Sequence, residues 1–197
     1  MLKTFHRQRG FSLIEFGIGL VIVSLLMTMG IPGFSNWIQN THIRTAAEDI
    51  QNGLQLSRAE AVRRNQPVSF QFTTAADNSC ALSTANGNWV VSLDDPTGAC
   101  ASTPSDTAAP RIIQMRDAAE GSVNAAVAAG QASITFNSLG RVTNALAGNI
   151  SIDISNPTGG ACLAAGGGMR CLRIGVSTLG QVRMCDPSLA SSNSQGC

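Results

Sequence analysis

The sequence has no tyrosine, only two histidines and few charged residues. Aromatic residues make up 5% of its 197 residues. Charged residues make up 13%, whereas about 25% is usual in globular proteins. The formal net charge of +1 excludes a generally basic nucleic-acid-binding protein and an acidic disordered chain. The length of the chain allows one domain, or one domain with an appended segment.

Motifs of the common enzyme classes are also missing. The sequence has no G-x-S-x-G element, no Walker A loop and no paired-carboxylate motif. Gly166-Gly167-Gly168 lacks the lysine that follows a phosphate-binding loop, and we interpret it as a flexible loop. His42 is the only histidine beyond residue 10 and no Cys-x-x-C pair occurs, which argues against a zinc site. We therefore expect no enzyme activity, no cofactor and no metal.

The first part of the chain is strongly patterned. Its first ten residues carry three positive charges, from Lys3, Arg7 and Arg9, and no acidic residue. Residues 11–29 are almost all apolar, and with the extension to Phe34 the stretch reaches the roughly 20 residues that cross a bilayer. The basic flank predicts that residues 1–10 stay in the cytoplasm and that the remainder is translocated. Without a small-residue cleavage site after the run, an uncleaved signal anchor is the simplest interpretation.

Glu15 does not fit a simple signal anchor. A carboxylate inside an apolar span costs about 2.5–3.5 kcal/mol on insertion scales. No Lys, Arg or His lies between Phe11 and His42 to serve as its partner. The partner is therefore expected from another molecule, and the free α-amine of a neighbouring Phe11 would serve if the chain were cut after Gly10.

The sequence from Gly10 to Glu15, GFSLIE, resembles the type IV prepilin (class III signal) motif. The resemblance implies cleavage between Gly10 and Phe11 by a prepilin peptidase and N-methylation of Phe11. It also implies that Glu15 pairs with the N-terminus of a neighbouring subunit during assembly. Pro32 stands where pilins commonly carry a helix-kinking proline, and we expect a kink near Thr28–Pro32.

An amphipathic pattern continues the helix over residues 35–65. Apolar and small residues recur in steps of three and four along one helical face: Ile43, Ala47, Ile50, Leu54, Ser57 and Ala61. The helix is expected to end at Asn65–Pro67, because the residue before a proline disfavours the helical conformation. We expect this stripe to pack within the chain, under a soluble head. Residues 56–65 resemble the end of the first helix in minor pilins and pseudopilins of the GspH/FimT type.

Residues 66–197 are predicted to form a β-rich head on that helix. Alternating residues at 68–72 and 150–154 predict half-exposed antiparallel strands. We expect Ala118–Ala132 to form a loop or a weak strand. The predicted fold class is α+β, a long N-terminal helix packed against antiparallel sheets. The strand-like runs are 68–72, 89–93, 112–115, 133–136, 150–154, 171–177 and 181–185.

The resemblance extends into the head. Residues 134–142 and 171–185 resemble two hairpins of GspH/FimT-type proteins, which implies a pilin-like roll with two small sheets. Residues 73–130 carry no such likeness and are expected to form the variable region. The predicted organisation is a cleaved leader (1–10), a membrane or filament-core helix (11–34), its amphipathic continuation (35–65) and a disulfide-stapled periplasmic head (66–197).

Six cysteines all lie beyond the apolar run. An even number of cysteines in a translocated domain predicts disulfides. Closeness in sequence favours Cys80–Cys100. For the others, Cys162–Cys171 with Cys185–Cys197 is slightly preferred. The alternative pairs Cys171 with Cys185 across a hairpin and leaves Cys162 for Cys197.

The resemblance implies a minor type IV pilin that helps to initiate or cap pilus assembly, or else a type II secretion pseudopilin. Its partners would be other major and minor pilins or pseudopilins, a prepilin peptidase and an inner-membrane assembly platform. It would be a single-pass inner-membrane protein with a cytoplasmic N-terminus and a periplasmic head, and later part of the pilus fibre.

DNA binding for natural transformation is the alternative function. Some members of the family bind DNA through a G-R-x-R motif in the terminal hairpin. Here the aligned residues 180–183 read G-Q-V-R, so glutamine replaces the first arginine. A solvated strand face is the plainer interpretation of these arginines. The candidate DNA-binding residues are Arg141, Arg170, Arg173 and Arg183.

Overall fold

The structure is a computed structural model that describes residue 10, residues 12–145 and residues 148–197. The chain divides into two compact units, Met1–Ser35 and Asn36–Cys197. One α-helix, α1 (Leu13–Arg64), contributes to both. The side chains of residues 29–33, Pro32 among them, are not described, so the kink near Thr28–Pro32 stays a prediction.

In the first unit, the described side chains of α1 from Leu13 to Thr28 are all exposed. They are predominantly apolar, and Leu13 and Ile14 are 92% and 71% exposed. Among the described residues, no helix meets the combined demands of length and hydropathy for crossing a membrane.

The predicted stripe on the second part of α1 is confirmed as intramolecular packing. All six of its residues are buried, and the five apolar ones join one hydrophobic core with strands of the head. The helix ends at Arg64, followed by Asn65 in the left-handed conformation (φ 52°). Asn65 N–H donates to Val62 O and Gln66 N–H to Ala61 O, the hydrogen-bond pattern of a Schellman cap.

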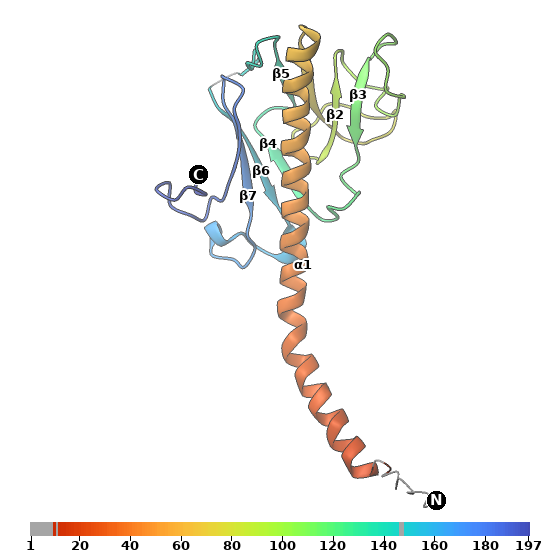
Figure 1. The fold of residues 1–197 in the computed structure, drawn as a ribbon, viewed down its shortest axis with the longest axis vertical. Coiled ribbons are helices and arrows are strands. Elements are labelled where there is room, and N and C mark those ends of the chain that lie inside the picture. The colour runs from red at the N-terminus through yellow and green to blue at the C-terminus, as the bar shows by residue number, and fades with distance from the viewer. Residues whose placement is uncertain (1–9, 11, 146–147) are drawn as a thin grey trace, which may run out of the picture. The chain divides into compact units, whose positions relative to one another are not determined.

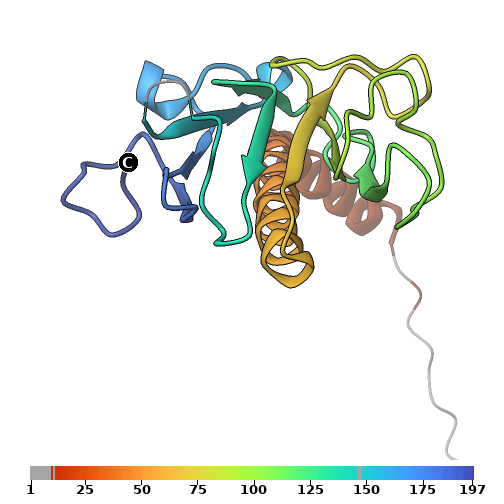
Figure 2. The same ribbon diagram turned by 90° about the horizontal axis from the view of Figure 1, so that it is seen from above.

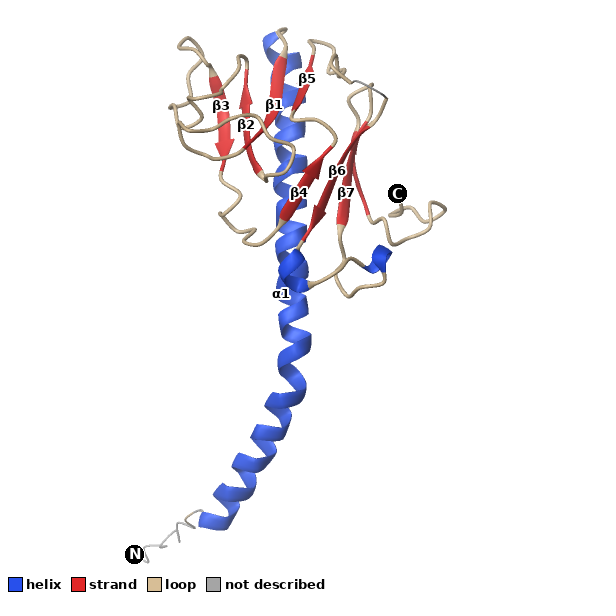
Figure 3. Ribbon diagram, turned by 180° about the vertical axis from the view of Figure 1, so that it is seen from behind, coloured by secondary structure: helices blue, strands red, loops and turns tan. Residues whose placement is uncertain are grey.

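The head contains two four-stranded antiparallel sheets, which confirms the predicted α+β class. Both sheets lie on the same side of the helix (Figures 1 and 3), and the view from above shows them arching over it (Figure 2). The first sheet has the order β3-β2-β1-β5 and the second β4-β6-β7-β8. The strands are β1 (Val68–Thr73), β2 (Asn88–Ser92), β3 (Ile112–Arg116), β4 (Ala126–Ala129), β5 (Ser133–Phe136), β6 (Ile150–Ser155), β7 (Leu172–Val176) and β8 (Val182–Cys185).

The chain changes sheets three times between β3 and β6. β4 pairs with β6 in the second sheet, but the next strand, β5, returns to pair with β1 in the first. The register of β5 on β1 places Ile134 opposite Phe70 and Phe136 opposite Val68. All four of these side chains are fully buried and face the helix core.

A glycine on the helix allows the aromatic part of the core to pack closely. A Cβ on Gly53 would lie 2.7 Å from Phe70 Cε2 and 3.0 Å from Trp89 Cη2. The rings of Phe70 and Trp89 are 5.3 Å apart, and Phe70 also packs edge-on against Phe72 at 4.9 Å. Because Gly53 has no side chain, these rings reach the helix backbone.

The expectation that residues 68–72 are half-exposed is wrong. In β1, Gln71 and Thr73 are buried as well as the apolar residues. Gln71 Nε2 donates to Ser92 Oγ at 2.9 Å and to Asp94 O at 3.2 Å. β1 lies inside its sheet, and the outer face of that sheet carries a second small core. This core comprises Cys80, Val90, Cys100 and Ile112.

Of the two alternatives for Ala118–Ala132, the structure has a short strand, β4, at residues 126–129. Val127 of β4 is buried opposite Ile154 of β6, and Ala129 pairs with Ile152. The alternating pattern expected for residues 150–154 is confirmed, since Ile150, Ile152 and Ile154 are buried and Ser151 is exposed.

All six cysteines are disulfide-bonded. The pairs are Cys80–Cys100, Cys162–Cys171 and Cys185–Cys197, with Cα–Cα distances of 6.2, 5.5 and 5.2 Å. This is the arrangement preferred from the sequence. The β7–β8 register explains why Cys171 does not pair with Cys185. Cys185 lies opposite Arg173, which is two residues after Cys171. Cys171 and Cys185 are therefore diagonal neighbours, and such pairs are about 7–8 Å apart, too far for a disulfide.

Candidate functional site

The assembly motif predicted from the sequence begins just before α1. Gly10 is exposed and lies outside the helix, while Phe11 lies outside the described residues. Glu15 is exposed in the first turn of α1, where a carboxylate interacts favourably with the positive end of the helix dipole. Within the part of the chain that the structure describes, Glu15 makes no ion pair.

The apolar side chains that follow Glu15 form a long uncovered apolar surface. From Phe16 to Met27 their exposed fractions range between 48% and 66%. Such a long uncovered apolar stretch marks a surface that another molecule or a lipid phase covers. The residues are Phe16, Ile18, Leu20, Val21, Ile22, Val23, Leu25, Leu26 and Met27.

Three of the four candidate DNA-binding arginines have partners inside the head. Arg170 Nε lies 2.6 Å from Asp186 Oδ2, and Arg173 Nε lies 2.6 Å from Asp153 Oδ1. Arg183 Nη2 donates to the backbone carbonyls of Ser194 and Gly196, at 2.8 and 3.0 Å. Arg183 therefore holds the C-terminal segment against β8.

The structure brings only part of this arginine set together. Arg173 of β7 and Arg183 of β8 lie on neighbouring strands. Ile174 and Val176 of β7 point into the core, so Arg173, and Arg183 opposite Gly175, face away from the helix. Arg170 precedes β7, and Arg141 lies in the turn after β5. Arg141 is exposed, and its guanidinium has no partner among the described residues.

Asp186 is the most buried carboxylate near these arginines, at 3% exposure. Burial raises its pKa, but hydrogen bonds from the Ser188 hydroxyl and the Arg170 guanidinium outweigh burial, and the pKa is lowered overall. Sequence reasoning missed Asp186 and Asp153 as arginine partners. No local signal could have found them, because only the strand register brings them to Arg170 and Arg173.

A second charged cluster lies at the end of α1. Glu60 accepts hydrogen bonds from Arg63 and Arg64, and Arg64 Nη1 also lies 2.6 Å from Asp106 Oδ1 in the β2–β3 loop. The hydrogen bond from Arg63 is the main cause of the lowered pKa of Glu60. The Arg64–Asp106 pair ties this loop to the helix.

An open groove of about 650 Å³ lies between α1 and the second sheet. Its walls carry two internal ion pairs, Arg44–Glu48 and Arg170–Asp186. The half-buried side chains of Leu172 and Met184 also line it. No sequence pattern indicated this groove, because its walls are about 130 residues apart in the chain.

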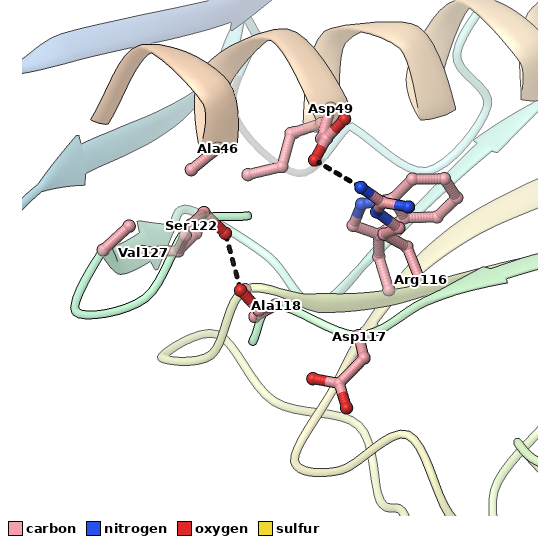
Figure 4. Close-up of a pocket in the computed structure, with 11 residues that line it drawn as sticks. Ala46, Asp49, Arg116, Asp117, Ala118, Ser122 and Val127 are labelled. Atoms are coloured by element: carbon pink, nitrogen blue, oxygen red, sulfur yellow. Dashed lines mark hydrogen bonds and ion pairs between the residues drawn. The ribbon is translucent and has the colours of Figure 1, made fainter. Parts of the chain in front are cut away.

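A small pocket of about 10 Å³ lies between α1 and the loop after β3 (Figure 4). Arg116 Nη2 lies 3.4 Å from Asp49 Oδ2 at its edge, and the Ser122 hydroxyl donates to Ala118 O. Arg116 Nε is buried without a hydrogen-bond partner among the described atoms. The pocket is the size of a single water molecule, so it cannot hold a substrate.

Comparison with known proteins gives one match by family. The sequence model of the family described as type II transport protein GspH matches residues 46–180. No curated protein matches the chain.

Solved structures give further matches at low sequence identity. The crystal structure of the type IV minor pilin FimU of Pseudomonas aeruginosa is 15% identical, covering 76% of this chain and 94% of that chain, with a TM-score of 0.47. The solution structure of E. coli GspH is 16% identical, covering 76% of this chain and 91% of that chain, with a TM-score of 0.43.

Proposed function

Because the chain belongs to the GspH family of pilin-like proteins, we propose that it is a minor type IV pilin that helps to initiate or cap pilus assembly. The observation that supports this most is the contrast along α1. From Leu13 to Thr28 the described side chains are exposed and mostly apolar, whereas the stripe from Ile43 to Ala61 is buried under the head. The first stretch polymerises with other subunits, and the second carries the head.

Assembly begins with removal of the leader. A prepilin peptidase cuts between Gly10 and Phe11, and Phe11 becomes N-methylated. The exposed, non-helical Gly10 supports access of a peptidase to this bond. The new α-amine then pairs with Glu15 of a neighbouring subunit. This pairing satisfies a carboxylate that otherwise lies uncompensated among apolar side chains.

The same chemistry fits a pseudopilin of a type II secretion system, and the description of the matching family favours this alternative. In either role the chain starts in the inner membrane with a periplasmic head. Its partners are other major and minor pilins or pseudopilins and the assembly platform. DNA binding is the less favoured function, because internal partners hold three of the four candidate arginines.

Replacing Glu15 tests the proposal. We expect Glu15→Val to leave leader cleavage intact and to abolish recovery of the protein in sheared filaments, because the register-setting charge is gone. Glu15→Asp keeps the charge and should retain partial incorporation.

Cleavage is read from the mass of the membrane-bound protein, and incorporation from blots of sheared filaments. Wild-type levels of Glu15→Val in filaments would show that the carboxylate has no role in assembly.

A further inference from the structure

Two segments of the head share a sequence pattern. Residues 134–142 read ITFNSLGRV and residues 174–182 read IGVSTLGQV, so isoleucine, leucine, glycine and valine recur at matched positions. Each segment begins in a strand, β5 or β7, and then leaves it in a turn. The proposed function assigns no role to either turn.

The repeat is also structural, because the two turns have the same hydrogen bonds. In the first turn, Asn137 N–H donates to Arg141 O, and Gly140 N–H donates to Asn137 O. Arg141 N–H donates to the Asn137 side chain. Ser177, Gly180 and Gln181 make the same three hydrogen bonds in the second turn. Gly140 and Gly180 both have positive φ, 71° and 80°.

The two turns touch each other and the end of α1. Val142 N–H donates to Thr178 O at 3.1 Å, and a Cβ on Gly180 would overlap the carbonyl oxygen of Gly140. Arg58 of α1 lies over both glycines. Its Nε would be 3.0 Å from a Cβ on Gly140 and 3.4 Å from one on Gly180.

This contact gathers exposed apolar side chains in one place. Leu139 and Leu179, each next to a glycine of the contact, are 74% and 64% exposed. Val62 is 53% exposed, and its Cγ2 would lie 3.4 Å from a Cβ on Gly140. The hydrogen bonds of these turns come from backbone groups and from the Asn137 and Ser177 side chains, so none of them requires a leucine side chain at either position.

The charges around these side chains are positive and unpaired. The guanidinium groups of Arg58 and Arg141 have no hydrogen-bond or ion-pair partner among the described residues. By contrast, carboxylates or backbone carbonyls hold Arg170, Arg173 and Arg183. We call Val62, Leu139, Leu179, Arg58 and Arg141 the twin-turn patch.

We propose that the twin-turn patch binds an acidic segment of another protein, in which an apolar side chain is flanked by Asp or Glu. An apolar centre with a charged rim is the usual anatomy of a protein interface, and the two unpaired arginines select carboxylates. A nucleic acid fits less well, because the patch offers aliphatic side chains where a strand needs stacking rings or many phosphate contacts. This inference goes beyond the proposed function and does not depend on it.

Photo-crosslinking of the full-length chain in cells tests the patch. A benzophenone amino acid replaces Leu139 or Leu179, and the crosslinked peptides are sequenced by mass spectrometry. We expect both positions to capture the same acidic, apolar segment. The same probe at Leu163, which is 48% exposed elsewhere on the head, should not capture it.

Charge reversal then tests the rim. Arg58→Glu with Arg141→Glu should lower the crosslink yield at least about tenfold, because like charges at an interface are strongly disfavoured. Arg44→Glu, an exposed arginine on the same helix, should leave it unchanged, and intact disulfides verify folding of each variant. The proposal is overturned if no crosslink forms, or if the probes capture lipid, DNA or a segment without acidic residues. It is also overturned if the crosslink yield does not change when Arg58 and Arg141 are replaced. Filament incorporation, measured in parallel, reports separately on the proposed function.

Discussion

At the scale of single residues, the buried side chain of Asp186 accepts three hydrogen bonds. It accepts from Arg170 Nε at 2.6 Å and from the Ser188 hydroxyl and backbone N–H at 2.6 and 2.9 Å. It lies directly after Cys185 and is 3% exposed. It therefore links the entry to β7, where Arg170 lies, with the C-terminal segment.

We expect Asp186→Asn to lower the free energy of unfolding by about 1.5–3 kcal/mol at pH 7, the usual range for a hydrogen bond to a charged group. Asp153→Asn is the matched control. Its pair with Arg173 is 44% and 41% exposed, and such a surface pair contributes only about 0–1 kcal/mol. Urea titration of both variants measures the difference, and equal effects would contradict the assigned role of Asp186.

The same residue gives a dependence on pH. The pKa of Asp186 in the folded chain is lowered relative to about 3.9 in an unfolded chain. Its contribution is therefore complete above about pH 3.9 and is lost as the pH falls through the folded pKa. We expect the stability difference between wild type and Asp186→Asn to narrow between about pH 4 and pH 2. A difference that stays constant down to pH 2 would exclude this linkage.

At the scale of elements, helix α1 is adapted at Gly53 to the rings beneath it. In an exposed helix, Gly→Ala stabilises by about 1 kcal/mol. At this position the new methyl group meets Phe70 and Trp89, which are 0% and 3% exposed and cannot move freely.

We therefore expect the opposite sign for Gly53→Ala, a destabilisation of about 1–3 kcal/mol from overpacking. Gly17→Ala serves as the control, because no atom lies within 4 Å of a Cβ there. Thermal unfolding followed by circular dichroism compares the two. A higher Tm for Gly53→Ala would mean that the rings relax at little cost.

Some elements can be predicted from local sequence patterns, and others depend on contacts with distant parts of the chain. The stripe from Ile43 to Ala61 and the strands with β-branched residues are local patterns, and they were predictable. The alanine- and glycine-rich run at residues 118–132 has no strand signal of its own, so the sequence does not distinguish a strand from a loop there. β4 becomes a strand through its pairing with β6. The buried state of Gln71 was missed for a similar reason, since it depends on which strands flank β1.

At the scale of the whole molecule, the disulfides fasten the parts of the head that have little apolar core. Cys80–Cys100 holds the outer face of the first sheet, and Cys185–Cys197 holds the C-terminal segment to β8. Each bond contributes about 2–4 kcal/mol in a typical domain. The head has few aromatic side chains that could substitute for this contribution.

Tryptic mapping of the unreduced protein distinguishes the two cysteine arrangements. We expect Cys80–Cys100 within peptide 65–111 and Cys185–Cys197 within peptide 184–197. Cys162–Cys171 should join peptide 142–170 to the tripeptide 171–173. The alternative arrangement would instead join both of these peptides to 184–197, and that mass would rule out the observed pairing.

The change of sheets between β3 and β6 has a consequence for how the head is made and inherited. The first sheet needs residues 68–136 and the second needs residues 126–185, so the two stretches overlap. A chain emerging from the ribosome completes neither sheet before residue 136. Recombination at a single point cannot exchange one whole sheet between two genes. Every crossover point between β3 and β6 separates at least one strand from the other strands of its sheet.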